Sequence, residues 1–208
     1  GKGGVNLPTN MDISEVPFKP WAKALYEERR RDQQKNDPHA RCMPPGGPRQ
    51  FHTPYGLAIH ELPDAKRVLI LSGGGPRTWR EIYMDGRKHP DDLDPTWGGH
   101  SIGRWEGNTL VVDVTNFSPK SAFQGAHENL HLVEKWERVD SDTLRYTVTI
   151  TDPTVWTKPW TVTYDMKKQN DDDNRIYPEP RCHEGNHGMV GILAGARREE
   201  AAAKQGKK

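Results

Sequence analysis

The chain has 208 residues, 33% of them hydrophobic, with 30 basic and 29 acidic side chains for a formal net charge of +1. This length suits one domain with appendages, and the low hydrophobic share indicates that much of the chain forms surface or extended arms. The basic and acidic residues are interspersed, which excludes the sustained basic face of a nucleic-acid-binding protein.

One helix is predicted in the N-terminal region, between two irregular segments. Residues 1–16 show no periodicity and are expected to form an extended arm. Pro20 then opens a helix over residues 21–34, because proline is favoured in the first helical turn. Residues 36–54 contain five Pro, so they are expected to form an ordered connection without regular structure. The narrow apolar stripe of the helix consists of Trp21, Ala24 and Leu25.

The middle of the chain is predicted to be all-β. Its turn dipeptides, drawn from 20 Gly and 17 Pro, favour short strands over long helices. About eight strands, nearly all in sequential antiparallel order, close most simply into an up-and-down barrel without free edges. A half-open barrel and a two-sheet sandwich are the alternatives. The expected strands cover residues 55–61, 67–72, 78–84, 100–105, 109–115, 130–136, 144–150 and 160–166.

The last three of these strands show the clearest pattern, because apolar residues recur at every second position from Leu130 to Met166. This period is typical of a β-meander with one buried face. A register slip of one residue would invert every side chain, so the prediction is specific. The predicted buried face carries Leu132, Trp136, Tyr146, Val148, Ile150, Trp160, Val162 and Tyr164, and the opposite face carries Lys135, Thr147, Thr149, Thr161 and Thr163.

Glu134 interrupts this apolar pattern. It falls in phase with Leu132 and Trp136, so the alternation directs a carboxylate toward the inside. A buried carboxylate needs a partner because its desolvation is costly, and a raised pKa would suit a general acid or base. We expect the partner to be Arg138 or Arg104. The alternative to a catalytic or ligand-binding carboxylate is a structural Glu–Arg pair inside the barrel.

The polar, proline-rich loop over residues 85–99 is long for a connection within a β-domain, and such loops often carry function. Side chains at the strand ends around it are candidates for a site, because barrels bind ligands at their mouths. The alternative is that the indoles cap the barrel and the polar groups bond the loop to itself. The candidates are His52, Asp85 and His100 for acid–base chemistry, with Tyr83, Trp97, Arg104, Trp105 and Arg138 for ligand contact.

No Gly-x-Ser-x-Gly, P-loop, dinucleotide or EF-hand motif is present, so no cofactor is expected. Two pairs of His are spaced four apart, His127 with His131 and His183 with His187. That spacing brings ligands together only on a helix, whereas His131 lies in a strand pattern. We therefore expect no metal site.

The chain is expected to consist of three parts. The C-terminal part is Ala-rich and is predicted to form a helix over residues 189–205, with Met189, Ile192 and Leu193 available to dock it. No apolar run approaches the roughly 20 residues of a membrane span. The parts are residues 1–54 (arm, helix and Pro-rich connection), 55–168 (barrel) and 169–208 (loop and helix).

Cys42 and Cys182 are the only cysteines, and they lie in the irregular segments on either side of the strands. Neither belongs to a Cys-x-x-Cys pair, which excludes thioredoxin-type chemistry. A disulfide between them and two buried free thiols are the alternatives. The chain begins with Gly1 rather than Met, which is compatible with a removed signal peptide.

Five short motifs are distinctive: Asp85-Gly86-Arg87, His89-Pro90, the run from His100 to Val112, Asp152-Pro153 and the run from Cys182 to Asn186. They resemble a family of uncharacterised secreted bacterial β-rich proteins common in acidobacteria and proteobacteria. The resemblance implies a periplasmic or extracellular location with the export signal removed, and it favours the disulfide. The resemblance identifies no catalytic residues in this chain. Gly103-x-Trp105 is also similar to the lipocalin Gly-x-Trp signature, at a mid-chain position.

Three functions are compatible with these observations. The preferred one is a secreted β-barrel that binds a small apolar or aromatic ligand, which the meander and seven Trp support. The second is an exported lyase, isomerase or hydrolase that uses Glu134 with His52, His100 or Asp85. The third is a subunit of a homo-oligomer or larger assembly held by the N-terminal arm and the terminal helices.

Overall fold

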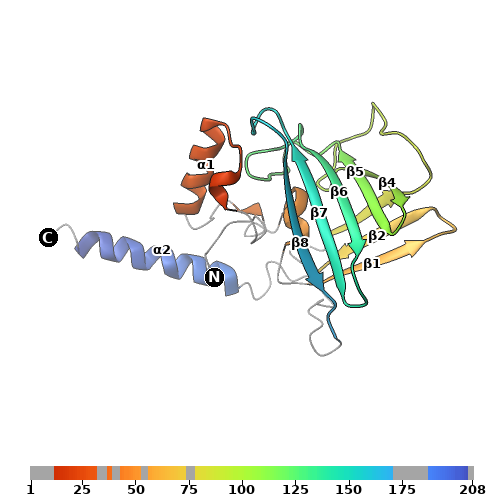
Figure 1. The fold of residues 1–208 in the computed structure, drawn as a ribbon. Coiled ribbons are helices and arrows are strands. Elements are labelled where there is room, and N and C mark those ends of the chain that lie inside the picture. Colours follow the sequence, from red (N-terminus) through yellow and green to blue (C-terminus); the bar gives the residue numbers. More distant parts are fainter. Residues whose placement is uncertain are drawn as a thin grey trace.

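The structure is a computed structural model, and it describes residues 12–31, 37–38, 43–52, 56–73, 78–170 and 187–205. Eight strands form one sheet in which the spatial order follows the chain, and the sheet curls into a half-barrel (Figure 1). The strands are β1 (Leu57–Leu62), β2 (Arg67–Ser72), β3 (Thr78–Tyr83), β4 (His100–Glu106), β5 (Thr109–Thr115), β6 (His131–Arg138), β7 (Thr143–Thr151) and β8 (Trp160–Lys167).

All neighbouring strands are antiparallel except β3 and β4, which run parallel. A parallel pair needs a long crossover, and residues 84–99 supply it without a helix. A Cβ at Gly103 would lie 2.6 Å from both the Ile82 Cγ2 and the Met84 Sδ atoms, so glycine allows β4 to approach β3. In the described ranges no backbone pairing joins β8 to β1, so the fold is the half-open form of the predicted barrel.

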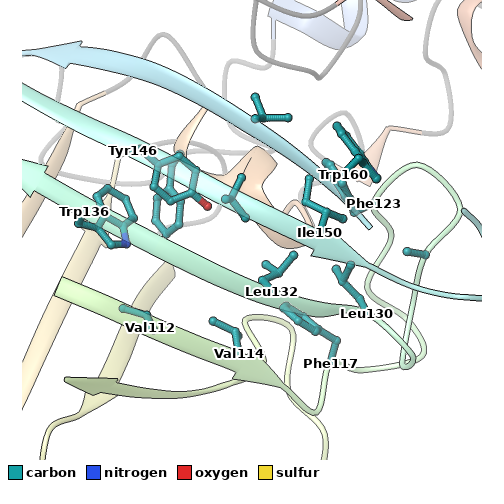
Figure 2. Packing of buried hydrophobic residues seen from close by; sticks show 14 of the residues in the cluster. Val112, Val114, Phe117, Phe123, Leu130, Leu132, Trp136, Tyr146, Ile150 and Trp160 are labelled. Atoms are coloured by element: carbon teal, nitrogen blue, oxygen red, sulfur yellow. The ribbon is translucent and has the colours of Figure 1, made fainter. Parts of the chain in front are cut away.

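The inner face of the sheet carries the hydrophobic core, and the predicted face of the meander is confirmed. Seven of its eight predicted members are buried and Tyr164 is half-buried against them, while the opposite face is exposed or half-buried. Figure 2 shows Trp136 and Tyr146 side by side on adjacent strands, and Trp160 near Phe123 at the other end of the cluster. The period of two therefore determined which side chains are buried.

The N-terminal helix α1 (Pro20–Arg31) begins at the predicted proline, and the predicted end at residue 34 lies outside the described residues. Its buried residues are Ala22 and Tyr26, so the expected stripe was wrong at Trp21 and Ala24, which are exposed, while Leu25 is half-buried. Phe18 forms an isolated bridge with Trp156, and Trp21 donates from Nε1 to the Thr154 carbonyl at 3.0 Å. The segment that includes α1 therefore packs on its own chain, at the connection between β7 and β8.

A short 3₁₀ helix, η3 (Gly47–Phe51), corrects the expectation that residues 36–54 hold no regular structure. Pro48 stands in its first turn, where proline is tolerated because the missing N–H has no helical partner. Phe51 reaches the inner face and meets Trp136 edge-on at a ring-centroid distance of 5.0 Å. The proline-rich connection thus fills the curve of the half-barrel.

The C-terminal helix α2 (His187–Gln205) begins two residues before the predicted start. Val190 is 67% exposed and Leu193 is 48% exposed, so Leu193 does not dock the helix as expected. The side chains of Met189 and Ile192 lie outside the described set. Among the described helices, none is long and apolar enough to cross a bilayer.

Candidate functional site

The inner face contains a fully buried ion pair. Glu134 on β6 is 0% exposed, and Arg80 on β3 donates from Nη1 to its Oε1 at 3.0 Å and from Nη2 to its Oε2. Arg80 also donates from Nε to the Ser101 hydroxyl at 3.2 Å. The two-pronged contact satisfies both carboxylate oxygens, which is the geometry a buried Glu–Arg pair requires.

Tyr146 completes this inner cluster by donating its hydroxyl to Glu134 Oε1 at 2.8 Å. Complete burial raises the pKa of Glu134, while Arg80 and the Tyr146 hydroxyl oppose that rise. Burial and the adjacent carboxylate raise the pKa of Tyr146 well above its usual value, so the phenol stays protonated and acts as a donor. Because the Arg80 guanidinium donates a hydrogen bond to each Glu134 carboxylate oxygen, we infer that this carboxylate is ionised at neutral pH.

The partner of Glu134 was predicted incorrectly. Arg104 pairs with Glu106 and has a 64% exposed side chain, and Arg138 donates to carbonyls of the turn that follows β6. Arg80 could have been found from the alternation within β3, since it shares a phase with the buried Ile82. Trp79 alternates with Arg80 and is exposed on the opposite face of β3. A large aromatic residue is usually expected to be buried, so its presence makes the alternation hard to recognise from the sequence.

Aromatic rings surround the ion pair. Trp136, Tyr146 and Tyr164 lie opposite one another on β6, β7 and β8, with ring-centroid distances of 4.4 and 5.3 Å between neighbours. Phe51 covers the Arg80 guanidinium at 5.0 Å from its ring centroid. His52 meets Tyr164 edge-on at 5.5 Å, and its pKa is lowered by burial and then by Arg49. We call these five rings the aromatic cluster.

Two hydrogen-bond donors in the aromatic cluster have no partner among the described residues. They are the buried Trp136 Nε1 and the buried Tyr164 hydroxyl oxygen. The Trp136 indole N–H faces the Glu134 carboxylate and helps to lower its pKa, although the contact does not meet hydrogen-bond geometry. Buried donors normally have a partner, so these two groups are able to bind an acceptor atom from beyond the described residues.

A second polar cluster lies on the outer face, under the loop of residues 84–99. His89 from the loop faces His100 on β4, with 2.7 Å between the two Nδ1 atoms. The Nε2 of His89 lies 2.9 Å from Asp113 Oδ1 on β5, and the Nε2 of His131 on β6 lies 3.0 Å from Asp113 Oδ2. We call these four residues the histidine cluster.

Tyr83 closes the histidine cluster on one side, where its ring stacks on His100 at 5.0 Å. The guanidinium carbons of Arg67 and Arg87 lie 4.2 and 4.0 Å from the Tyr83 ring centroid. Asp85 binds Arg87 through both carboxylate oxygens, and this hydrogen bonding lowers the pKa of Asp85. Tyr83, Asp85 and His100 are thus neighbours, as predicted from their positions around the loop.

The remaining predicted residues do not join them. His52 lies beside Tyr164 on the inner side, and Glu134 is inside the core, whereas His100 is on the outer face. Trp105 is 52% exposed near the end of β4, and the Trp97 carbonyl accepts from the Ser121 hydroxyl at 3.4 Å. The expectation of one mouth lined by all these side chains was therefore wrong, because the sheet separates them.

Sequence reasoning did not identify His89 or Asp113 as members of a site. Asp113 could have been found because it alternates with Val112 and Val114 on β5, which places it on the outer face next to His131. His89 offered no periodic signal, since it lies in an irregular loop. His127 contacts the Ser121 carbonyl through Nδ1 and does not converge with His131.

Within the part of the chain that the structure describes, no group of three or more His, Cys, Asp or Glu side chains has a geometry that could hold a metal ion. The two Nδ1 atoms of the histidine pair are 2.7 Å apart, which suits a shared proton; two bonds of about 2.0–2.1 Å to one zinc ion would hold them further apart. Cys42 and Cys182 lie outside the described residues, so their disulfide stays a prediction.

Comparison with known proteins gives no relative for this fold and these clusters. No protein-family model matches the chain, and no match was found among curated proteins or solved structures.

Proposed function

We propose that this protein binds a small neutral aromatic ligand with a carbonyl oxygen, on the inner face of the half-barrel beside Glu134. The observation that carries the proposal is a pair of donors within one group of aromatic rings, Trp136 Nε1 and the Tyr164 hydroxyl, that have no hydrogen-bond partner among the described residues. A carbonyl oxygen accepts two hydrogen bonds, and an aromatic body gains from contact with rings at this spacing.

Charge balance favours a neutral ligand. The Glu134 carboxylate is already neutralised by Arg80, and both its oxygens have donors. An added carboxylate or ammonium group would be a third, uncompensated charge in a buried site, which costs several kcal/mol. An apolar body with one acceptor requires no such compensation.

The aromatic cluster has one partly exposed side, and we propose that the ligand enters there. Tyr164, Leu144 and Met166 pack against the core while remaining partly exposed, and His52 beside them is half-buried. These residues lie at the end of the cluster toward the β6–β7 turn, where Leu144 and Met166 are paired neighbours. A ligand that enters there meets apolar surface first and the two donors next.

The test is an NMR titration of the indole N–H signals with acetophenone and benzamide, with benzoate as the charged counterpart. We expect the Trp136 indole signal to shift with the two neutral carbonyl compounds and to respond much less to benzoate. If the Trp136 signal does not move with either neutral compound at millimolar concentration, the proposal is wrong.

Three conservative variants sharpen this test, with binding followed by the NMR signals of the added compound because Trp136→Phe has no indole N–H at that position. Trp136→Phe and Tyr164→Phe each remove one neutral hydrogen bond, worth about 0.5–1.5 kcal/mol, and should weaken binding by about 2–10-fold. Trp160→Phe is the matched control, because Trp160 is also buried with an unpartnered Nε1 but lies at the other end of the core (Figure 2). An equal loss of affinity in Trp160→Phe would contradict the assigned position.

We propose further that the protein works in the periplasm or outside the cell. The support is the resemblance of its motifs to a secreted family, together with the two cysteines. Alkylation of the folded protein without reductant, followed by mass spectrometry, should leave Cys42 and Cys182 unmodified. Two modified thiols would remove the disulfide from this proposal.

A further inference from the structure

His89 is the main attachment of the central part of the long loop to the outer face. Between Asp85 and Thr96 it is the one half-buried residue, and the others are exposed. The far end of the loop is held separately, by Asn116, which donates to the Leu93 and Asp94 carbonyls at 3.0 and 3.3 Å. Near its centre the loop is therefore held by the contacts of the His89 imidazole and by the Arg87 guanidinium, which lies 4.0 Å from the Tyr83 ring centroid.

Those contacts fix the number of protons between the His89 and His100 Nδ1 atoms. An ionised carboxylate only accepts hydrogen bonds, so His89 and His131 donate to Asp113 from their Nε2 atoms. Of the two facing Nδ1 atoms of His89 and His100, one must donate and the other accept, because a hydrogen bond of 2.7 Å holds one proton. The docked arrangement therefore tolerates one shared proton and excludes two.

We propose that the His89–His100 pair is a pH-sensitive latch: it holds the loop of residues 84–99 against the sheet while the pair shares one proton, and it releases the loop when a second proton binds. With the second proton, both Nδ1 atoms carry hydrogen, so two N–H groups point at each other and the pair gains one positive charge. Both the lost hydrogen bond and the repulsion favour withdrawal of His89, since His100 is held in a strand.

The charges around the pair do not stabilise the doubly protonated state. Asp113 from β5 is the carboxylate in contact with His89, and it is shared with His131 from β6. Glu81 from β3 is engaged by Arg67 from β2. In the loop, Arg87 adds a positive charge that Asp85 neutralises, and the neutral Tyr83 ring covers His100.

The direction of the pH dependence follows from His100. Burial, then His89 and Arg87, lower the pKa of His100 below its usual value near 6.5, while Glu81 acts in the opposite direction. A histidine whose pKa is lower in the docked state than in the released state takes up a proton on release. Docking is therefore complete above about pH 6.5 and weakens progressively as the pH falls below that value.

The test measures loop mobility in the full chain by ¹H–¹⁵N heteronuclear NOE at Lys88, Asp91 and Asp92, at pH 7.5 and pH 5.0. We expect ordered values at pH 7.5 and a clear decrease at pH 5.0, with the amides of β6 to β8 unchanged at both. The unchanged strand signals separate loop release from unfolding. Equal values at the two pH settings overturn the proposal.

Three variants locate the effect in the histidine pair. His89→Gln breaks the pair and should make the loop mobile at both pH values. His100→Gln keeps a donor opposite His89 but cannot bind a second proton, so the loop should stay ordered at both. His60→Gln, on the exposed β1, is the matched control and should behave as the unmodified protein. A loop that is still released at pH 5.0 in His100→Gln assigns the switch elsewhere and overturns the latch.

Discussion

The two polar clusters lie on opposite faces of one sheet and differ chiefly in their contact with water. The inner cluster of Glu134, Arg80 and Tyr146 is sealed in the core, with Glu134 at 0% and Arg80 at 3% exposure. In the histidine cluster, the side chains of Asp113 and His131 are 31% and 40% exposed. Both clusters hold a carboxylate between two donors, yet only the outer one can exchange protons with solvent without disrupting the core.

This difference teaches what burial does to a charged group. Where water is excluded, an ion pair stays ionised over a wide pH range. Removal of one partner leaves the other as an uncompensated buried charge. At a partly exposed site, water compensates a missing partner, so each contact contributes less and titration becomes possible. The inner cluster should therefore dominate stability, and the outer one should dominate the response to pH.

The largest effect is expected from Glu134→Gln, which keeps the side-chain shape but leaves the Arg80 guanidinium buried without its counter-ion. The free energy of unfolding should fall by about 3 kcal/mol, measured by urea denaturation. Arg145→Gln breaks the exposed Arg145–Asp165 pair and serves as the control with little expected change. A loss in Glu134→Gln no larger than in this control would show that burial does not distinguish the clusters.

A smaller effect is expected from removing one hydroxyl of the inner cluster. Tyr146→Phe deletes the hydrogen bond to the Glu134 carboxylate and should cost about 1.5–3 kcal/mol, the range for bonds to charged groups. Tyr164→Phe removes a hydroxyl that has no partner within the described residues, so it should leave stability unchanged or raise it. Similar losses in both, compared by thermal and urea denaturation, would contradict the hydrogen-bond assignment.

The smallest effect on global stability is expected at the outer cluster, as a dependence on pH. Because the pKa of His100 is lowered in the folded protein, the contribution of this residue is complete above about pH 6.5 and declines at lower pH. The unfolding free energy of the unmodified protein should therefore fall relative to that of His100→Gln between pH 7.5 and 5.5. A constant difference across this range would mean that His100 does not titrate with folding.

The strand pattern was available from the sequence because it is local. Alternation with a period of two places the strands and sorts their side chains onto two faces, and this includes the inward position of Glu134. The predicted and observed starts of the second to fifth strands coincide, and the later strands differ by one residue or none at their starts. Prolines and glycines marked the connections, although η3 was missed because a 3₁₀ turn has no period long enough to detect.

Only the tertiary structure decided which residues from different elements meet. The pairing of Arg80 with Glu134 requires β3 and β6 to face one another across the curve of the sheet, and no sequence spacing specifies that curvature. The approach of His89 to His100 and Asp113 depends on the path of an irregular loop and on the parallel pairing of β3 with β4. The sequence by itself determined the face on which each strand residue lies; the partner of each polar side chain was decided by contacts between distant segments, where local periodicity carries no information.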